Sequence, residues 1–289
     1  MKEFKDFDSS KISWFRCGGK IDVFCIVENL GELNEVLNKY KNVNILPIGA
    51  GSNILIRDSG FHGLAIKFVG DFNKIEIIDN NKIKAGSGVL CSTLSKFATE
   101  NNLIGIEFLS TIPGTVGGII KMNAGCFNKE TKDVLIETNV LTNGEIKVLK
   151  NEDLQFSYRY SNLKNSDVVL SGLFQTRNAN EEEIKQSKKT LEEMQEHRKN
   201  NQIVGATCGS TFTNPTDKDG KKLSAWKLID DVGLRGYQIG GAKFSEKHCN
   251  FIINNGSAKA EDIENLIKLA QEKVKNKFDI DLNCEIKIV

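Results

Sequence analysis

The sequence of 289 residues contains no long apolar run and no excess of one charge. No stretch approaches the roughly 20 apolar residues that a membrane-spanning helix needs. The first eight residues, MKEFKDFD, lack the continuous apolar core of a signal peptide. We therefore expect a cytoplasmic protein with no membrane partner. Lys and Arg number 39 and Asp and Glu 38, so the net charge of +1 gives no reason to expect nucleic acid as a partner. The expected partner is a small molecule.

Paired cysteines and the common nucleotide-binding motifs are also missing. The seven cysteines form no C-x-x-C pair and no zinc-ligand spacing, so we expect free thiols and no bound metal. Gly49-Ala50-Gly51 begins a G-x-G-x-x-G pattern, but Ile54 replaces the third glycine and a strand-like run follows. Counting from Gly114, the glycine and Lys-Ser or Lys-Thr pair of a P-loop are absent. A Rossmann turn and nucleoside triphosphate chemistry are therefore excluded.

Clustered glycine is what the sequence does have. The stretch from Ile112 to Gly125, IPGTVGGIIKMNAG, holds four glycines and one proline. A second cluster, LPIGAGSN at 46–53, follows an apolar run, and Gly86-Ser87-Gly88 precedes a helical pattern. Glycine allows several backbone N–H groups to converge on an anion such as a diphosphate. A single loop of this kind is usually a surface turn, but three loops indicate one extended cofactor held by main chain.

Hydrophobic periodicity predicts mixed strands and helices, the pattern of an α+β protein. A β-α-β unit covers residues 21–48, and Asn143-Gly144 predicts a hairpin between the runs 134–141 and 145–149. The remaining predicted strands are at 64–68, 74–78, 82–85, 168–176, 237–244, 249–254 and 284–289, and the predicted helices are near 90–98, 178–201, 225–231 and 263–274. The stretch 112–125 is expected to be a loop.

An ordered series of motifs resembles the UDP-N-acetylenolpyruvoylglucosamine reductase family. PIGAGSN (47–53), IPGTVGG (112–118) and MNAG (122–125) look like the FAD-cradling loops of that family. The other motifs follow in the family's order over essentially the whole chain: SWFRCGG (13–19), FSYRYS (156–161), CGSTFTNP (208–215), AWKLID (225–230), IGGA (239–242), SEKH (245–248) and EIK (285–287). The extra tyrosine-bearing loop of the longer subtype is absent, so the chain resembles the shorter subtype.

The resemblance implies a fold and an activity. The expected fold is a two-lobed FAD-binding domain of the vanillyl-alcohol-oxidase/PCMH type with lobes at 1–62 and 63–180. A C-terminal α+β substrate-binding domain would occupy 181–289, and its last strand would pack back toward the FAD site. The implied reaction is the NADPH-dependent, FAD-mediated reduction of UDP-N-acetylglucosamine enolpyruvate to UDP-N-acetylmuramate for peptidoglycan synthesis. We expect a monomer.

Three residues match the catalytic positions of the family. Arg159, between Tyr158 and Tyr160, would stabilise the enolate; without the family, it could equally be a surface arginine over aromatic edges. Ser210 would donate the proton, although a serine in such a loop is usually a turn residue and not a catalyst. Glu285 would be the third catalytic residue, although a carboxylate in a terminal strand usually faces solvent.

The resemblance also assigns residues to the two ligands. The expected substrate contacts are Tyr158, Asn214, Lys227 and Lys247. The segment 197–203 departs from the family pattern, since isoleucine follows Gln202 where proline is expected, so we assign no contact to Arg198 or Lys199. The expected FAD contacts are Pro47, Ile48, Gly49, Ala50, Gly51, Ser52, Asn53, Gly86, Ile112, Pro113, Gly114, Thr115, Gly117, Gly118, Asn123, Ala124 and Gly125.

Two alternative functions stay open. One is an FAD-dependent alcohol or sugar oxidase of the same fold, in which His62 could attach the flavin covalently. We expect His62 to be a turn residue and FAD to bind non-covalently. The other is a nucleotide-sugar binder without turnover, against which the presence of Arg159, Ser210 and Glu285 speaks. Ser210 with His248 lacks the G-x-S-x-G elbow of a hydrolase.

Overall fold

The computed structural model describes residues 1–201, 203 and 205–289. The chain separates into two compact units. The first unit comprises Met1–Phe4, Val23–Ala50 and Gly63–Gln202, and the second comprises Lys5–Asp22, Gly51–His62 and Ile203–Val289. Among the described residues, buried apolar side chains form three clusters, two in the first unit and one in the second. The two domain boundaries expected from the sequence, at 62/63 and 180/181, stay a prediction.

The first cluster of the first unit lies between a helix and a four-stranded sheet. The sheet has the order β1-β2-β5-β3, and β3 pairs with β5 in parallel. Leu33 and Val36 of the helix are fully buried in this cluster with Val27 and Leu64. The predicted β-α-β unit is therefore present, and β1 is a strand that the sequence did not predict. The bounds are β1 Lys2–Asp8, β2 Lys20–Val27, α1 Leu30–Lys39, β3 Asn44–Ile48 and β5 Phe61–Phe68.

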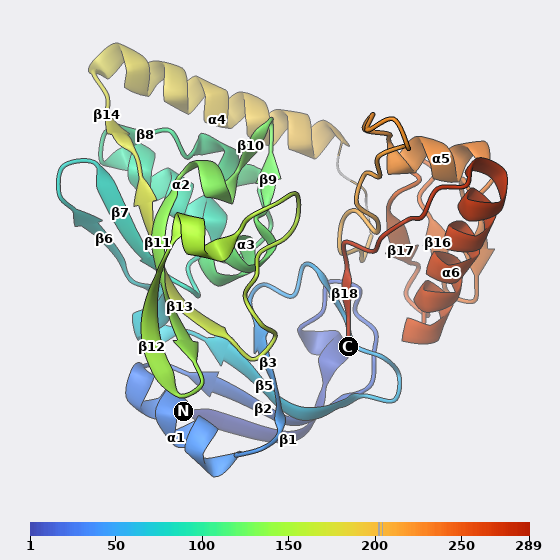
Figure 1. The fold of residues 1–289 in the computed structure, drawn as a ribbon, viewed down its shortest axis with the longest axis horizontal. Helices are drawn as coiled ribbons and strands as arrows, with labels where there is room; N and C mark the ends of the chain where they lie inside the picture. Colours follow the sequence, from blue (N-terminus) through green and yellow to red (C-terminus); the bar gives the residue numbers. More distant parts are fainter. Residues whose placement is uncertain (202, 204) are drawn as a thin grey trace. The chain divides into compact units, whose positions relative to one another are not determined.

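The second cluster lies on a five-stranded antiparallel sheet of order β12-β11-β13-β7-β6. The predicted hairpin is confirmed: Thr142 pairs with Glu145, and the turn residues Asn143 and Gly144 have φ of 51° and 81°. Figure 1 shows this sheet with α2 and α3 beside it. The bounds are β6 Ile75–Ile78, β7 Lys82–Gly86, α2 Cys91–Glu100, α3 Val116–Met122, β11 Leu135–Thr142, β12 Glu145–Lys150 and β13 Val168–Gln175.

The helix α3 corrects the expectation that 112–125 is a loop throughout. Its two glycines disfavour a helix by about 1 kcal/mol each relative to alanine. Val116, Ile119 and Ile120 nevertheless recur at helical spacing, and all three side chains are buried in the second cluster. Burial of this apolar stripe outweighs the low propensity of the glycines.

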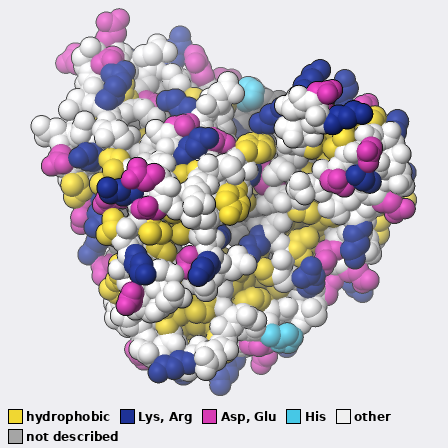
Figure 2. All heavy atoms as spheres, viewed as in Figure 1, with side chains coloured by type: hydrophobic (Ala, Val, Ile, Leu, Met, Phe, Trp, Pro, Cys, Tyr) yellow, Lys and Arg dark blue, Asp and Glu magenta, His cyan; other side chains and the backbone are white. Residues whose placement is uncertain are grey.

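Short strands and one long helix complete the first unit. The small pairs are β8 with β14 and β9 with β10, and the helix α4 follows β14. Among the described residues, no helix combines the length and apolar character needed to cross a membrane. On the face drawn in Figure 2, basic and acidic side chains are interspersed. The bounds are β8 Leu103–Ile104, β9 Gly125–Cys126, β10 Lys129–Glu130, β14 Arg177–Asn178 and α4 Glu181–Asn201.

The second unit packs two helices and short strands around its own core. Phe15 and Leu55, from early in the chain, are buried there with Phe212, Ile263 and Ile286. Strand β18 pairs in parallel with β4, and it is shorter than the predicted run 284–289 because Cys284 instead forms an isolated bridge with Phe212. The bounds are β4 Ile54–Leu55, α5 Ala225–Asp231, β15 Gln238–Ile239, β16 Ala242–Phe244, β17 Ile252–Asn254, α6 Ala260–Phe278 and β18 Lys287–Ile288.

A buried asparagine holds the loop that carries Ser210. The amide of Asn250 donates to Phe212 O at 2.8 Å and accepts from Phe212 N at 2.9 Å, and Asn250 O accepts from Thr211 N at 2.7 Å. Asn250 is 4% exposed. The side chain therefore takes the place of a neighbouring strand for Phe212.

We predict that Asn250→Ala lowers the free energy of unfolding, because both backbone groups of Phe212 would stay buried without a partner. Each unsatisfied group costs about 1–3 kcal/mol. Urea denaturation measures the change. The control is Asn276→Ala on the exposed side of α6, which should shift the free energy by no more than about 0.5 kcal/mol. Equal urea midpoints for the two variants would contradict the role of Asn250.

Candidate active site

Three of the predicted cofactor loops meet in the first unit. A Cβ atom on Gly49, directly after β3, would overlap Thr115 Oγ1. A Cβ on Gly117 would lie 3.1 Å from Ser87 Cβ, and Gly117 N donates to Ser87 O at 2.9 Å. The backbone of the first loop can approach the second only because residue 49 has no side chain. The structure thus brings together segments that are far apart in the sequence.

The polar groups of these loops fit a diphosphate-bearing cofactor. Within the described part of the chain, the N–H groups of Thr115 and Gly118 have no hydrogen-bond acceptor. Ser87 Oγ is buried and also lacks a partner among the described residues. Backbone amides and a hydroxyl group are suitable donors for phosphate oxygens. The residues of the first unit therefore fit an FAD diphosphate.

The other predicted cofactor residues of this unit lie in the same segments. Pro47 and Ile48 end β3, and Gly86 ends β7, where a Cβ atom would overlap Phe72 O. Gly114 O accepts from Cys91 N at 3.0 Å, which ties the loop to the start of α2. Ala50, Ile112 and Pro113 are half-buried in these loops.

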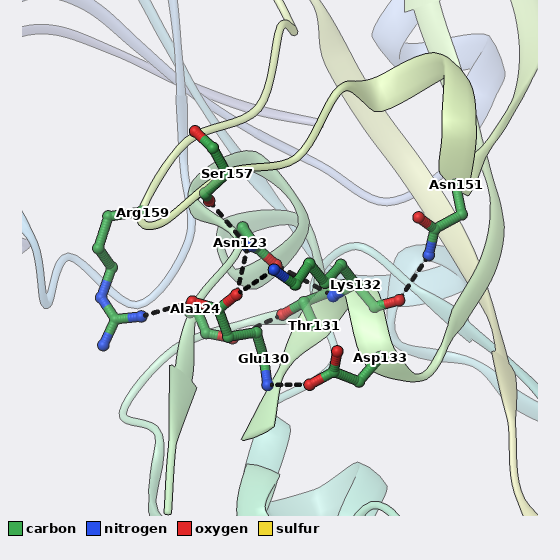
Figure 3. Close-up of polar contacts among 9 residues, drawn as sticks. All are labelled: Asn123, Ala124, Glu130, Thr131, Lys132, Asp133, Asn151, Ser157 and Arg159. Atoms are coloured by element: carbon green, nitrogen blue, oxygen red, sulfur yellow. Dashed lines mark hydrogen bonds and ion pairs between the residues drawn. The ribbon is translucent and has the colours of Figure 1, made fainter. Parts of the chain in front are cut away.

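Asn123 ends α3 in the left-handed conformation, with φ of 42°, and it is fully buried. Its Nδ2 donates to Ser157 O at 2.9 Å and to Glu130 Oε2 at 3.2 Å, and its Oδ1 accepts from Lys132 N at 3.0 Å (Figure 3). The side chain links the end of the glycine-rich stretch to the Tyr-Arg segment. These contacts give Asn123 a structural role. A direct contact between Asn123 and FAD stays a prediction.

Arg159 projects from a tight turn beside that asparagine. Ser157 and Tyr160 exchange backbone hydrogen bonds of 3.2 and 3.1 Å, and Arg159 between them has φ of 58°. Its Nη2 donates to Gly125 O at 2.8 Å, and its guanidinium carbon lies 4.9 Å from the ring centre of Tyr158. The predicted catalytic arginine, a predicted substrate contact and a predicted cofactor loop are therefore adjacent in the first unit.

Cys126 was not predicted as part of this site. Its Sγ lies 3.2 Å from Phe108 O and 3.2 Å from Thr111 Oγ1. Burial raises the pKa of the Cys126 thiol, while its hydrogen bond with Thr111 and the positive charges of Arg159 and Arg198 act in the opposite direction. Burial also lowers the pKa of Arg198. No signal in the sequence pointed to this neighbourhood, because it depends on the contact between α4 and the β9 strand region.

In the second unit the structure brings Ser210 close to Glu285. Glu285 N donates to Thr211 O at 2.8 Å, immediately after Ser210. Asn53 Nδ2 donates to Glu285 O at 2.9 Å, and Asn53 O accepts from Lys287 N at 3.1 Å. Two predicted catalytic residues and the end of the first glycine loop therefore share one small backbone network.

A close backbone approach fixes Gly51 within this network. It has φ of 72°, and a Cβ atom would overlap Ile12 O. Its own carbonyl accepts from Trp14 N at 3.0 Å, and Cys208 Sγ lies 3.5 Å from Ile54 O. The half-buried Ser52 follows it. Gly51 and the residues after it are thus held by other segments of the second unit.

The remaining predicted substrate contacts occupy the surface of the second unit. Asn214 Oδ1 accepts from Ala225 N at 3.0 Å, which joins the serine loop to the start of α5. Lys227 and Lys247 are exposed. Burial lowers the pKa of His248, whose ring lies 6.2 Å from that of Trp226. Gln202, part of the segment that departs from the family pattern, lies outside the described residues.

Among the side chains that the structure describes, His62 and the cysteines bear on the expected absence of a covalent flavin and of a metal. His62 is 79% exposed and its Nδ1 lies 3.3 Å from Asp22 Oδ1. Over the described ranges, no group of three or more His, Cys, Asp or Glu residues could hold a metal ion. All seven cysteines are free thiols. Non-covalent flavin binding stays a prediction.

Comparison with known proteins gives matches along the whole chain. The FAD binding domain family matches residues 21–150, and the UDP-N-acetylenolpyruvoylglucosamine reductase C-terminal domain matches residues 199–289. The chain is 41% identical over 287 residues to UDP-N-acetylenolpyruvoylglucosamine reductase of Rickettsia massiliae, covering 98% of this chain and 94% of the relative. It is 41% identical over 286 residues to the Pelagibacter ubique reductase, covering 98% and 93%.

A solved structure gives the same result for the fold. The crystal structure of UDP-N-acetylenolpyruvylglucosamine reductase (MurB) from Thermus caldophilus superimposes with a TM-score of 0.82 at 30% identity, covering 99% of this chain and 98% of that one. The predicted fold class, an FAD-binding domain followed by a C-terminal α+β domain, is confirmed. The chain belongs to the UDP-N-acetylenolpyruvoylglucosamine reductase family.

Proposed function

We propose that this protein reduces UDP-N-acetylglucosamine enolpyruvate to UDP-N-acetylmuramate, a step of peptidoglycan precursor synthesis, with NADPH as the reductant. When bound, FAD would supply the hydride-transfer chemistry that links NADPH to the enolpyruvyl group. Family membership supports the reaction class. The observation that supports the proposal is the hydrogen bond of 2.8 Å from Glu285 N to Thr211 O, because Thr211 directly follows Ser210 and the two candidate catalytic residues therefore belong to neighbouring segments.

The chain's own residues would handle the charge and the proton. Negative charge develops at C2 and over the adjacent carboxylate as hydride reaches C3. Arg159 offers a planar guanidinium, which matches a carboxylate with two donors, and Glu285 would contribute to the electrostatic environment. Ser210 would donate a proton to C2. A serine hydroxyl is a weak acid in water, but the carbanion-like acceptor is far more basic than the alkoxide left behind.

The remaining assignments follow from the positions of the loops. The Thr115 and Gly118 amides and Ser87 Oγ would hold the FAD diphosphate. Lys227 and Lys247 would contact the diphosphate and sugar of the substrate, and Asn214 would hold the serine loop against α5. A cytoplasmic enzyme that acts as a monomer is consistent with the small-molecule substrate.

We predict that the purified protein is yellow and that acid precipitation releases its flavin into the supernatant as FAD. The reason is that backbone amides, and no credible attachment residue, form the candidate site. The measurement is the visible spectrum of the supernatant and the pellet. A colourless protein that takes up no added FAD would refute the proposal, and yellow colour retained in the pellet would favour the oxidase alternative through His62.

We predict that Arg159→Lys loses most of its turnover and keeps its bound FAD. Lysine keeps the charge but not the planar fork, and loss of one such stabilising contact lowers kcat by about 10²–10³. Steady-state kinetics measure kcat, and the flavin spectrum measures cofactor content. The control is Arg177→Lys, because Arg177 is 60% exposed in an ion pair with Glu183. A kcat near that of the control would remove Arg159 from the mechanism.

We predict that Ser210→Ala separates the two half-reactions. Reduction of the flavin by NADPH involves no proton transfer to the enolpyruvyl group, so anaerobic bleaching should keep the rate of the unaltered protein. Reoxidation by UDP-N-acetylglucosamine enolpyruvate should slow by about 10²–10⁴, the usual contribution of a general acid. Stopped-flow absorbance measures both rates.

The matched control for this variant is Ser224→Ala, because Ser224 is exposed and its side chain makes no capping hydrogen bond to α5. Equal slowing of both half-reactions in Ser210→Ala would mean that Ser210 supports the loop or the flavin and is not the acid. Unchanged rates of both half-reactions in Ser210→Ala would mean that a group other than Ser210 donates the proton.

A further inference from the structure

A carboxylate lies beside the guanidinium of Arg159. Glu130 Oε1 is 3.9 Å from Arg159 Nη1, and the two side chains are 20% and 19% exposed. Figure 3 shows the two side chains approaching each other from the β10 strand and from the Tyr-Arg turn. An ion pair that is largely buried is screened by salt much less than an exposed one. The attraction between these two groups therefore acts on the orientation of Arg159.

The backbone and the second oxygen of Glu130 are held by other groups. Glu130 Oε2 accepts from Asn123 Nδ2 at 3.2 Å and lies 2.9 Å from Lys132 Nζ. Glu130 N donates to Asp133 Oδ2 at 2.8 Å. These contacts orient the carboxylate so that Oε1 is the oxygen nearer to Arg159. The position of the negative charge is thus set by the fold.

Two contacts of Arg159, besides the Tyr158 ring, bear on the orientation of its guanidinium plane. Nη2 donates to Gly125 O at 2.8 Å, and Nη1 lies on the side of Glu130. The distance of 3.9 Å exceeds the range of about 2.7–3.2 Å for an N–H···O hydrogen bond. Glu130 therefore attracts Nη1 without accepting a hydrogen bond from it. A carboxylate of a bound substrate could approach the guanidinium while the attraction persists.

We propose that Glu130 is a positioning residue for Arg159, which it orients toward the substrate carboxylate. This inference depends on the proposed function, because it assigns Arg159 a substrate to bind. It adds a residue outside the glycine loops and the three catalytic candidates. It also gives Lys132 a role, which is to balance the charge of Glu130 on the side away from Arg159.

The first test is Glu130→Gln in the FAD-loaded full-length protein. Glutamine keeps the size of the side chain and an oxygen that can accept from Asn123, and it removes only the charge. Reoxidation of reduced flavin by UDP-N-acetylglucosamine enolpyruvate should slow about tenfold. Reduction of the flavin by NADPH, the Kd for FAD and the Tm should equal those of the unaltered protein.

The matched control is Asp133→Asn, which alters the neighbouring carboxylate and keeps an oxygen that accepts from Glu130 N. It should leave both half-reactions unchanged. Glu130→Asp keeps the charge one methylene further from Arg159, and its reoxidation rate should fall between those of Glu130→Gln and the unaltered protein. This partial rescue would show that the charge matters, and a rate no better than that of Glu130→Gln would overturn the electrostatic role.

A double-mutant cycle tests whether Glu130 acts through Arg159. In an Arg159→Lys background, Glu130→Gln should slow reoxidation by less than twofold, because the group that it positions is already lost. A full tenfold loss in that background would overturn the proposal. A lower Tm, weaker FAD binding or equal slowing of both half-reactions in Glu130→Gln alone would also overturn it, since each indicates a structural role.

The reaction of the unaltered protein with the substrate distinguishes a failure of this inference from a failure of the proposed function. If the substrate fails to reoxidise its reduced flavin, the proposed function and the role of Glu130 both fail. If the substrate reoxidises that flavin and Glu130→Gln reacts at the same rate, only the positioning role fails.

Discussion

The buried amide of Asn123 is the contact on which the candidate site of the first unit depends. Its two ends bind two segments: the turn that carries Arg159, and the stretch that contains the carboxylate of Glu130 and the backbone of Lys132. A fully buried amide is costly unless its donors and acceptor are satisfied. Each segment therefore has one favourable position relative to the end of α3. The placement of Arg159 follows from a residue that needs no direct part in the chemistry.

Side-chain amides also hold irregular backbone in the second unit. Asn250 binds both backbone groups of Phe212, and Asn53 binds Glu285 O, so side-chain amides substitute for missing strand partners around Ser210. Asparagine suits this task because one side chain carries both a donor and an acceptor in one plane. In both units, the candidate catalytic side chains lie on irregular backbone that side-chain amides hold in place. Such backbone can place a side chain in a direction that the regular alternation of a continuous strand does not give.

Much of the fold could be predicted from the sequence, because local patterns determine it. The Asn143-Gly144 hairpin needs only residues that tolerate positive φ between two β-rich runs. The helix α3 was missed because glycine propensity argues against it, while its stability comes from burial of Val116, Ile119 and Ile120. Strand β1 was missed because its alternating pattern is weak, with Phe4 still 40% exposed.

The candidate site was only partly predictable. The glycine loops and Arg159, Ser210 and Glu285 could be named from motifs, but their neighbours could not. Glu130, Cys126 and Asn250 have no sequence signature, since each depends on contacts with distant segments. The contact between Asn53 and Glu285 joins residues 232 positions apart. Spacing along a chain carries no information about such a pair.

The composition of the second unit has a consequence for the order of folding during synthesis. Its core combines Phe15 and Leu55 with Ile263 and Ile286, so the early segments lack most of their partners until the residues up to Ile286 have been synthesised. At typical rates of synthesis this delay is on the order of tens of seconds. The first unit can close around its own two clusters in that time. We therefore expect the early apolar residues of the second unit to be the part of the nascent chain that most needs protection by a chaperone.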